Sequence, residues 1–275
     1  MGGSAATRGP LLDSREGISR LRITPWGLVS GAPAIALCEA GDAIALAGGP
    51  FAFTHAQLSG PEAPTDGTGD PAMSARQLRR WAARALDTGD DVPAALIARV
   101  SKPRPDIAGL AVSGAGARPR IMGVCNVTPD SFSDGGAHAT PDRAVAFGRA
   151  LHVAGADIID VGGESTRPGA ESVDPDTELA RVLPVISELA SHGIPVSVDT
   201  RRAQVMSAAI AAGATMFNDV SGLSDDPDSM SVVAAADMPV ILMHMQGQPS
   251  DMQFDPQYGV VLDDVYDALA ARVDA

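Results

Sequence analysis

The feature that most constrains the fold is a regular alternation of short apolar runs with amphipathic stretches, which begins at residue 121. Each apolar run is followed by a stretch with helical periodicity. Strands that alternate with helices predict a parallel sheet with helical crossovers, and near-continuous apolar strands are typical of a sheet buried on both faces. The expected strands are 121–127, 157–163, 195–199, 216–220 and 239–245.

The stretches between these strands predict four helices with apolar faces. They are expected over 141–156, 174–193, 201–214 and 226–237. The second should bury Leu179, Val182, Leu183, Ile186 and Leu189, and the third should bury Val205, Ala209 and Ile210.

Residues 1–114 lack this alternation. Short apolar runs are mixed with Gly pairs, and the segment 61–71 has the composition of a loop. A helix is expected over 74–87, with Ser74 as its N-cap and with Leu78, Trp81 and Leu86 on one side. We therefore divide the chain into a small α+β region of unknown role, 1–114, and a second domain, 115–275.

The charge and hydropathy of the chain exclude some classes of function. The formal net charge is −14, which disfavours a nucleic-acid binder because phosphate backbones attract Lys and Arg. There is no run of about 18 apolar residues and no secretory signal pattern, so no membrane span is expected. A soluble cytoplasmic protein is the prediction.

Polar side chains cluster at the carboxyl ends of the expected strands. Asn126 ends the first strand, Asp160 and Glu164 lie at or after the second, and Asp199 ends the third. The fourth contains Asn218 and Asp219, and the fifth contains His244. In a β/α barrel, and also in an open doubly wound sheet, the ligand site is built at this end. No G-x-G-x-x-G pattern follows the first strand, which disfavours a dinucleotide site.

Two loops between strands and helices carry chemistry. In TPDSFSDGG (128–136), Phe132 can cover an apolar ring and Asp134 can stabilise a cation, although a merely solvated acidic loop has the same composition. In GGESTRPGA (162–170), Thr166 and Arg167 suit an anionic oxygen and Pro168 shapes the turn. A plain surface ion pair between Arg and Glu is the alternative for this second loop.

Asp199 and Asn218 can together recognise a flat heterocycle. The carboxylate accepts from ring N–H groups, and the amide supplies a donor and an acceptor. A structural network between strand ends is the alternative reading. Met243 and Met245 are expected on one face of the last strand, suited to packing on an aromatic ring, with His244 on the other face as a structural histidine or a ligand.

These motifs together resemble the dihydropteroate synthase family. GVCNVTPDSFSDGG, DIIDVGGESTRPGA, PVSVDTRRAQV, FNDVSG and LMHMQGQP occur in the family's order over residues 120–275. The resemblance implies a TIM (β/α)8 barrel, of which about the first five strand–helix units are present. It also implies condensation of a dihydropterin methyl diphosphate with 4-aminobenzoate, which gives dihydropteroate and diphosphate, and it leaves a homodimer open.

The resemblance also implies roles for individual residues. Asn126 would contact a Mg²⁺ ion held by the diphosphate, and Asp134 and Arg167 would be catalytic. The substrates would be bound by Thr166, Asp199, Asn218, Met243, Phe132 and Pro168.

One departure from the family lies at the carboxyl end. The family pattern continues with three further strands that carry a pterin-binding Asp, a Ser-Arg-Lys segment and an Arg-x-His, and none of these follows residue 245. The sequence therefore predicts a truncated barrel that is poorly stable or inactive alone. Two alternatives remain: a pterin-binding methyltransferase domain, which has no need for a diphosphate site, and a non-catalytic remnant.

Overall fold

The computed structural model describes residues 21–60, 63–64, 72–114, 118–128, 140–165, 172–248 and 251–275. Contacts divide the chain into two compact units, Met1–Pro119 and Arg120–Ala275. Each unit has its own apolar core and is described by itself below.

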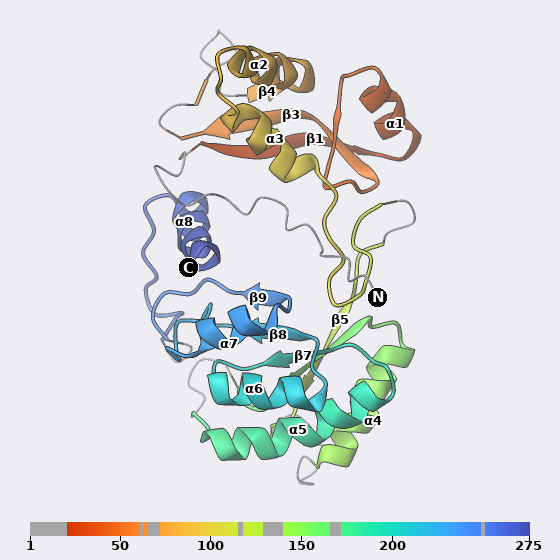
Figure 1. The fold of residues 1–275 in the computed structure, drawn as a ribbon, viewed down its shortest axis with the longest axis vertical. Helices are drawn as coiled ribbons and strands as arrows, with labels where there is room; N and C mark the ends of the chain where they lie inside the picture. The colour runs from red at the N-terminus through yellow and green to blue at the C-terminus, as the bar shows by residue number, and fades with distance from the viewer. Residues whose placement is uncertain are drawn as a thin grey trace, which may run out of the picture. The chain divides into compact units, whose positions relative to one another are not determined.

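The first unit contains an antiparallel sheet with the long strand β3 at its centre. In its described residues β3 (Phe51–Ser59) pairs with β1 (Arg22–Ser30), β2 (Ile44–Ala45) and β4 (Ala72–Ser74). The helices are α1 (Gly31–Glu39), α2 (Ala75–Asp87) and α3 (Val92–Ser101) (Figure 1). Ala56 and Leu58, which alternate along β3, are buried together with Phe53 of the same strand and Leu78 of α2.

The predicted N-cap of α2 is confirmed. The backbone N–H of Ser74 donates to Oε1 of Gln77 at 2.8 Å, and the backbone N–H of Gln77 donates to Oγ of Ser74 at 3.3 Å, which forms a capping box. Trp81 packs against the core as expected, but Leu86 is 53% exposed, so that prediction was wrong. Leu86 lies in the last helical turn, about 80° around the axis from Leu78.

The second unit has the predicted parallel α/β architecture. In its described residues the strand order is β5 (Met122–Asn126), β6 (Ile158–Gly162), β7 (Val196–Asp199), β8 (Met216–Asp219) and β9 (Val240–Leu242). Helices α4 (Pro141–Val153), α5 (Pro175–Ser191), α6 (Ala203–Ala212) and α7 (Ser229–Ala236) connect them, and α8 (Val261–Asp274) follows β9. These are five successive strand–helix units in the order of a β/α barrel.

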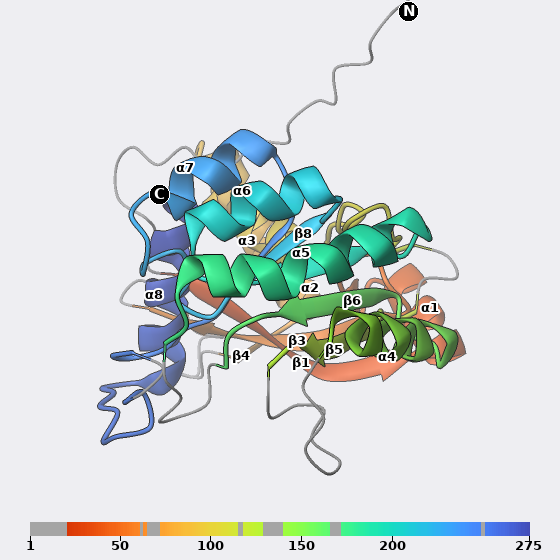
Figure 2. The same ribbon diagram turned by 90° about the horizontal axis from the view of Figure 1, so that it is seen from below.

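The four connecting helices cover one face of this sheet (Figures 1 and 2). The core between the two layers contains Val161, Val198 and Phe217 from the strands with Ile186 and Leu189 from α5, all with no exposed surface. The strand residues that alternate with these core residues point to the opposite face of the sheet, because successive side chains of a strand lie on opposite faces.

Two details of the predicted elements were wrong. The last strand ends at Leu242, so Met243, His244 and Met245 lie beyond it and do not alternate on a strand. The chain there leaves the sheet and turns into a loop, in which the side chain of Gln246 pairs with the backbone of Gln257. Ile210 is 37% exposed because it lies about 140° around α6 from the buried Val205.

Candidate functional site

A row of polar side chains lies on the face of the parallel sheet opposite the four connecting helices. The register pairs Asn126 with Gly162, Gly162 with Asp199, and Asp199 with Asn218. Paired residues of neighbouring strands share a face, and their sequence neighbours point into the helix-covered core. The predicted residues Asn126, Asp199 and Asn218 are thus brought together at the carboxyl ends of β5, β7 and β8.

Asp160 lies on the same face of β6, two residues before Gly162. Its Oδ2 accepts a hydrogen bond from Nδ2 of Asn218 at 2.9 Å. The residue is only 4% exposed, and its Oδ1 has no hydrogen-bond partner among the described residues. Burial raises the pKa of Asp160, while the nearby hydroxyl of Ser197 and the amide of Asn218 oppose the rise.

Asp199 has a different environment from Asp160. Burial, followed by the negative charge of Asp160 and smaller contributions from other carboxylates, raises the pKa of Asp199 to about 7. All the principal influences on Asp199 favour its neutral form, whereas Asp160 has neighbours that favour its charge. Both carboxyl groups thus have raised pKa values, and shifted values of this kind are common in ligand sites.

Gly162 keeps the space between Asn126 and Asp199 open. A Cβ atom at this position would lie 3.2 Å from Oδ1 of Asn126 and 3.3 Å from Oδ2 of Asp199. Both distances are tighter than ordinary van der Waals contact. The amide oxygen and the carboxylate thus line a gap that only glycine leaves free.

The remaining predicted site residues fall into two groups. Met243 lies just after β9, where its backbone N–H donates to the backbone carbonyl of Asp219 at 3.3 Å, at the end of β8. The other five lie outside the described residues: Phe132, Asp134, Thr166, Arg167 and Pro168.

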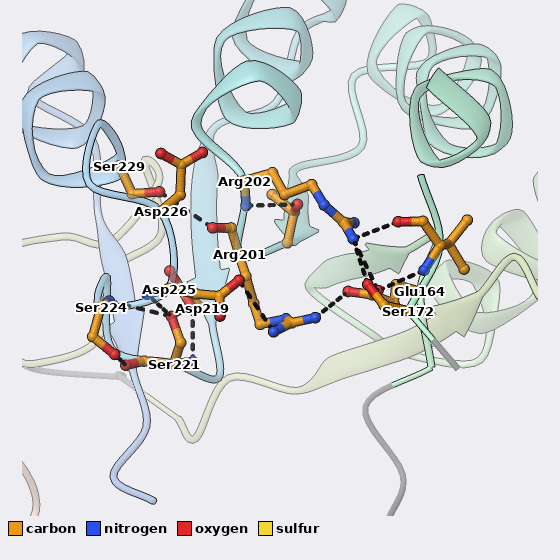
Figure 3. A network of polar contacts seen from close by, with 12 residues as sticks. Glu164, Ser172, Arg201, Arg202, Asp219, Ser221, Ser224, Asp225, Asp226 and Ser229 are labelled. Atoms are coloured by element: carbon orange, nitrogen blue, oxygen red, sulfur yellow. Dashed lines mark hydrogen bonds and ion pairs between the residues drawn. The ribbon is translucent and has the colours of Figure 1, made fainter. Parts of the chain in front are cut away.

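A buried ionic network, which the sequence reasoning missed, links the segments that follow β6 and β7 (Figure 3). Glu164, two residues after β6, accepts from Nη2 of Arg201 at 2.8 Å and from Nη2 of Arg202 at 3.0 Å. Arg202 also pairs with Glu178 of α5, which has no exposed surface. The signal in the sequence was the Arg-Arg pair that begins two residues after Asp199, since two adjacent cations after a buried strand need anionic partners.

This network connects the described residues on either side of positions 166–171. Glu164 precedes that segment, while Ser172 and Val173 follow it. Oε1 of Glu164 accepts from Oγ of Ser172 at 3.0 Å and from the backbone N–H of Val173 at 2.9 Å, and Arg202 donates to Ser172 at 3.1 Å. The hydrogen bonds and the two guanidinium groups together lower the pKa of Glu164 against the effect of burial.

Asp219 and His244 have structural roles. Asp219 points to the helix side of β8, and its Oδ1 accepts from the backbone N–H and the hydroxyl of Ser221, both at 2.7 Å, which holds the turn after the strand. His244 pairs through Nε2 with the hydroxyl of Tyr258 at 3.2 Å. The structural interpretation of His244 is thus favoured over a ligand role.

The donor set near Asn126 fits a Mg²⁺ ion that is only partly held by protein. Among the described residues no group of three His, Cys, Asp or Glu side chains could hold a metal. Mg²⁺ prefers oxygen ligands, keeps several waters and is often bound by one or two side chains plus substrate phosphates. The amide oxygen of Asn126, at the edge of the gap beside Gly162, suits such an ion.

Comparisons with known proteins agree with the fold and the motifs. Residues 122–275 match the family model described as pterin binding enzyme. A dihydropteroate synthase from Neisseria meningitidis serogroup C is 47% identical over 157 residues, which are 56% of this chain and 56% of that protein. The dihydropteroate synthase of Mycobacterium leprae is 48% identical over 156 residues, 56% of this chain and 55% of that protein.

Solved structures show the same similarity. Xanthomonas albilineans dihydropteroate synthase with 4-aminobenzoic acid is 51% identical with a TM-score of 0.52, over 56% of this chain and 55% of that one. Yersinia pestis dihydropteroate synthase with a sulfonamide drug complex is 44% identical with a TM-score of 0.54, over 57% of each chain. The chain spans about half the length of the curated relatives it matches. The resemblance drawn from the motifs is confirmed, and the chain belongs to the family of pterin binding enzymes.

Proposed function

We propose that this chain carries the pterin-binding half of a dihydropteroate synthase. The reaction condenses 6-hydroxymethyl-7,8-dihydropterin diphosphate with 4-aminobenzoate and gives 7,8-dihydropteroate and diphosphate. The observation that carries the proposal is the row of Asn126, Asp160, Asp199 and Asn218 at the carboxyl ends of adjacent parallel strands. The relatives, which are dihydropteroate synthases, support the same reaction.

The row suits the pterin ring. Its 2-amino-4-oxo pyrimidine edge presents an N–H and an exocyclic NH2, which a carboxylate such as Asp199 can accept together. The amide of Asn218 adds a further hydrogen-bonding group at the next strand. Met243 would pack nearby, since thioethers make favourable contacts with aromatic rings.

The chemistry needs positioning more than covalent help from the protein. The amine nitrogen of 4-aminobenzoate forms a bond to the methylene carbon of the pterin. The C–O bond to diphosphate breaks, its electron pair leaves with the diphosphate oxygen, and the amine nitrogen then releases a proton. Holding the two substrates in line with water excluded is the main contribution of such a site.

We propose the remaining roles by the family motifs. Asp134 would stabilise the electron-poor methylene, Thr166 would lie near the substrates, and Arg167 would help to bind the leaving diphosphate. Phe132 and Pro168 would border the aminobenzoate. Asn126 would hold Mg²⁺ together with the diphosphate, and the bound ion would neutralise charge on the leaving group.

Three further features of the protein are proposed with this function. Residues 1–114 would form a region separate from the pterin-binding domain 115–275, and the protein would act in the cytoplasm. None of the helices in the described residues combines the length and apolarity needed to cross a membrane. A homodimer is the assembly to test, and sedimentation of the purified chain would decide it.

Calorimetry with 6-hydroxymethyl-7,8-dihydropterin diphosphate, with and without Mg²⁺, tests the function. We expect Mg²⁺-dependent binding, lost in Asp199→Ala and retained in Arg149→Ala on the exposed side of α4. Binding of a folate without any need for Mg²⁺ would instead support a methyltransferase domain. Binding of neither ligand would support a non-catalytic remnant, and release of diphosphate on adding 4-aminobenzoate would establish turnover.

A further inference from the structure

Asp160 and Asn218 make a hydrogen bond across an intervening strand. They lie on β6 and β8, with β7 between them, so their backbones are about 10 Å apart at the usual strand spacing. The register places the small residue Ser197 of β7 beside Asp160, which leaves room for the two side chains to meet over β7. A contact of this kind is a specific arrangement of three strands and not a product of one local turn.

The contact determines which way the amide of Asn218 points. An amide has an oxygen end and an NH2 end of nearly equal size, so packing alone does not choose between them. An ionised carboxylate only accepts hydrogen bonds, and Oδ2 of Asp160 receives Nδ2 at 2.9 Å. The NH2 end is therefore held toward Asp160, and Oδ1 is left on the side away from it.

Burial raises the pKa of Asp160, and two neighbouring side chains oppose that rise. Its neighbours Ser197 and Asn218 favour its ionised form, while the charge of Asp160 is itself one reason why the neighbouring Asp199 keeps its proton up to about pH 7. Asp160 is more than nine-tenths buried, so its charge is poorly screened by solvent. A fixed acceptor at this depth holds the amide more firmly than water would.

We propose that Asp160 is a positioning residue that orients the Asn218 amide, so that the site reads hydrogen-bond donors on the ligand's pyrimidine edge. Asn218 then offers its oxygen beside the carboxyl group of Asp199, and a 2-amino ring is matched by this pair. A 2-oxo ring of the same shape places its oxygen against the amide oxygen of Asn218, which is unfavourable because buried polar groups are left unpaired. The inference rests on the proposed function and adds to it the specificity of the site for a 2-amino ring.

The first test needs no ligand. In ¹H–¹⁵N spectra of the intact chain, one side-chain amide proton of Asn218 should be shifted from its partner and protected from solvent exchange. Asp160→Asn should abolish this protection. Asp219→Asn, a matched buried aspartate on the helix side of β8, should leave it intact. Equal exposure of both protons in the wild-type chain would overturn the inference.

The second test measures affinity for 6-hydroxymethylpterin and for 6-hydroxymethyllumazine, which carries oxygen at position 2. The wild-type chain should prefer the pterin, and Asp160→Asn should reduce this preference at least about tenfold, a change of 1.4 kcal/mol or more. Asn218→Ala should lose the same preference, and the double variant should lose no more than either single one. An unchanged preference in Asp160→Asn would refute the positioning role.

The two tests separate the inference from the function on which it rests. If the wild-type chain binds neither ring, the proposed function fails, while the exchange measurement still decides how Asn218 is oriented. If Asp160→Asn does not fold, as judged by circular dichroism, Asn218→Ala and the wild-type spectrum decide the matter.

Discussion

The Nη2 atom of Arg202 lies 3.0 Å from Oε1 of Glu164, and both side chains are nearly buried. The same guanidinium pairs with Glu178, which has no exposed surface. One guanidinium group thus contacts two buried carboxylates, Glu164 after β6 and Glu178 of α5. The arrangement stabilises the fold only while all three groups are present, because an unpaired buried charge is costly.

Arg202→Ala is expected to lower the free energy of unfolding of the second unit by about 3–5 kcal/mol, since it leaves Glu164 and Glu178 without a common cation. Arg202→Lys should recover part of the loss, because lysine keeps the charge but not the two-pronged geometry. Urea unfolding followed by circular dichroism would measure both.

The tryptophans supply an internal control for this experiment. Trp26 and Trp81 both belong to the first unit, so their fluorescence transition should stay in place while the dichroism transition of the second unit moves. A loss of less than about 1 kcal/mol, the size of an exposed ion pair, would contradict the buried role of Arg202.

Asp199 should make stability depend on pH between about 4 and 7. Its pKa is about 7 in the folded protein against an ordinary value of 3.8, so in this window the folded state holds a proton that the unfolded state lacks. The free energy of unfolding therefore falls as pH rises through the window, by up to about 4 kcal/mol, and this contribution is constant above it.

Asp199→Asn should remove this part of the pH dependence, because the amide stays neutral throughout. Urea midpoints at pH 5 and pH 8 for the two proteins would measure the difference. The same slope with pH in both proteins would show that Asp199 does not hold the proton.

Gly162→Ala should weaken binding of the pterin diphosphate at least about tenfold, a cost of about 1.4 kcal/mol. The added methyl would crowd Oδ1 of Asn126 and Oδ2 of Asp199, at 3.2 Å and 3.3 Å. Gly259→Ala is the matched control, since its Cβ would meet Asp264 at an ordinary 3.7 Å. Calorimetry on both variants would show whether the gap matters; equal affinities would mean that it does not.

Cys125 should be unreactive in the folded protein. Burial, followed by the negative charge of Asp160, raises the pKa of its thiol to about 11, so only about a thousandth is thiolate at pH 8. Cys38 is half-buried and should account for all rapid reaction. Ellman's reagent should count one thiol in buffer and two in urea, and Cys38→Ser should abolish the rapid phase.

Much of the second unit could be predicted because its signals are local. The alternation of apolar runs identified β5 to β8 to within one or two residues, since hydrophobic periodicity reports a strand or helix directly. Where local patterns were ambiguous the prediction was wrong. Met243 and His244 continue an apolar run, but their chain turns into a loop tied to Gln257 and Tyr258.

The sequence by itself determined the kind of fold, the family motifs and the residues Asn126, Asp199 and Asn218 at the strand ends. It could not determine their partners. Asp160 and Asn218 are 58 positions apart, and Glu164 and Arg202 are 38 apart. Only the register of the parallel strands decides which side chains meet across such separations, because a shift of one residue would turn every one of them to the other face of the sheet.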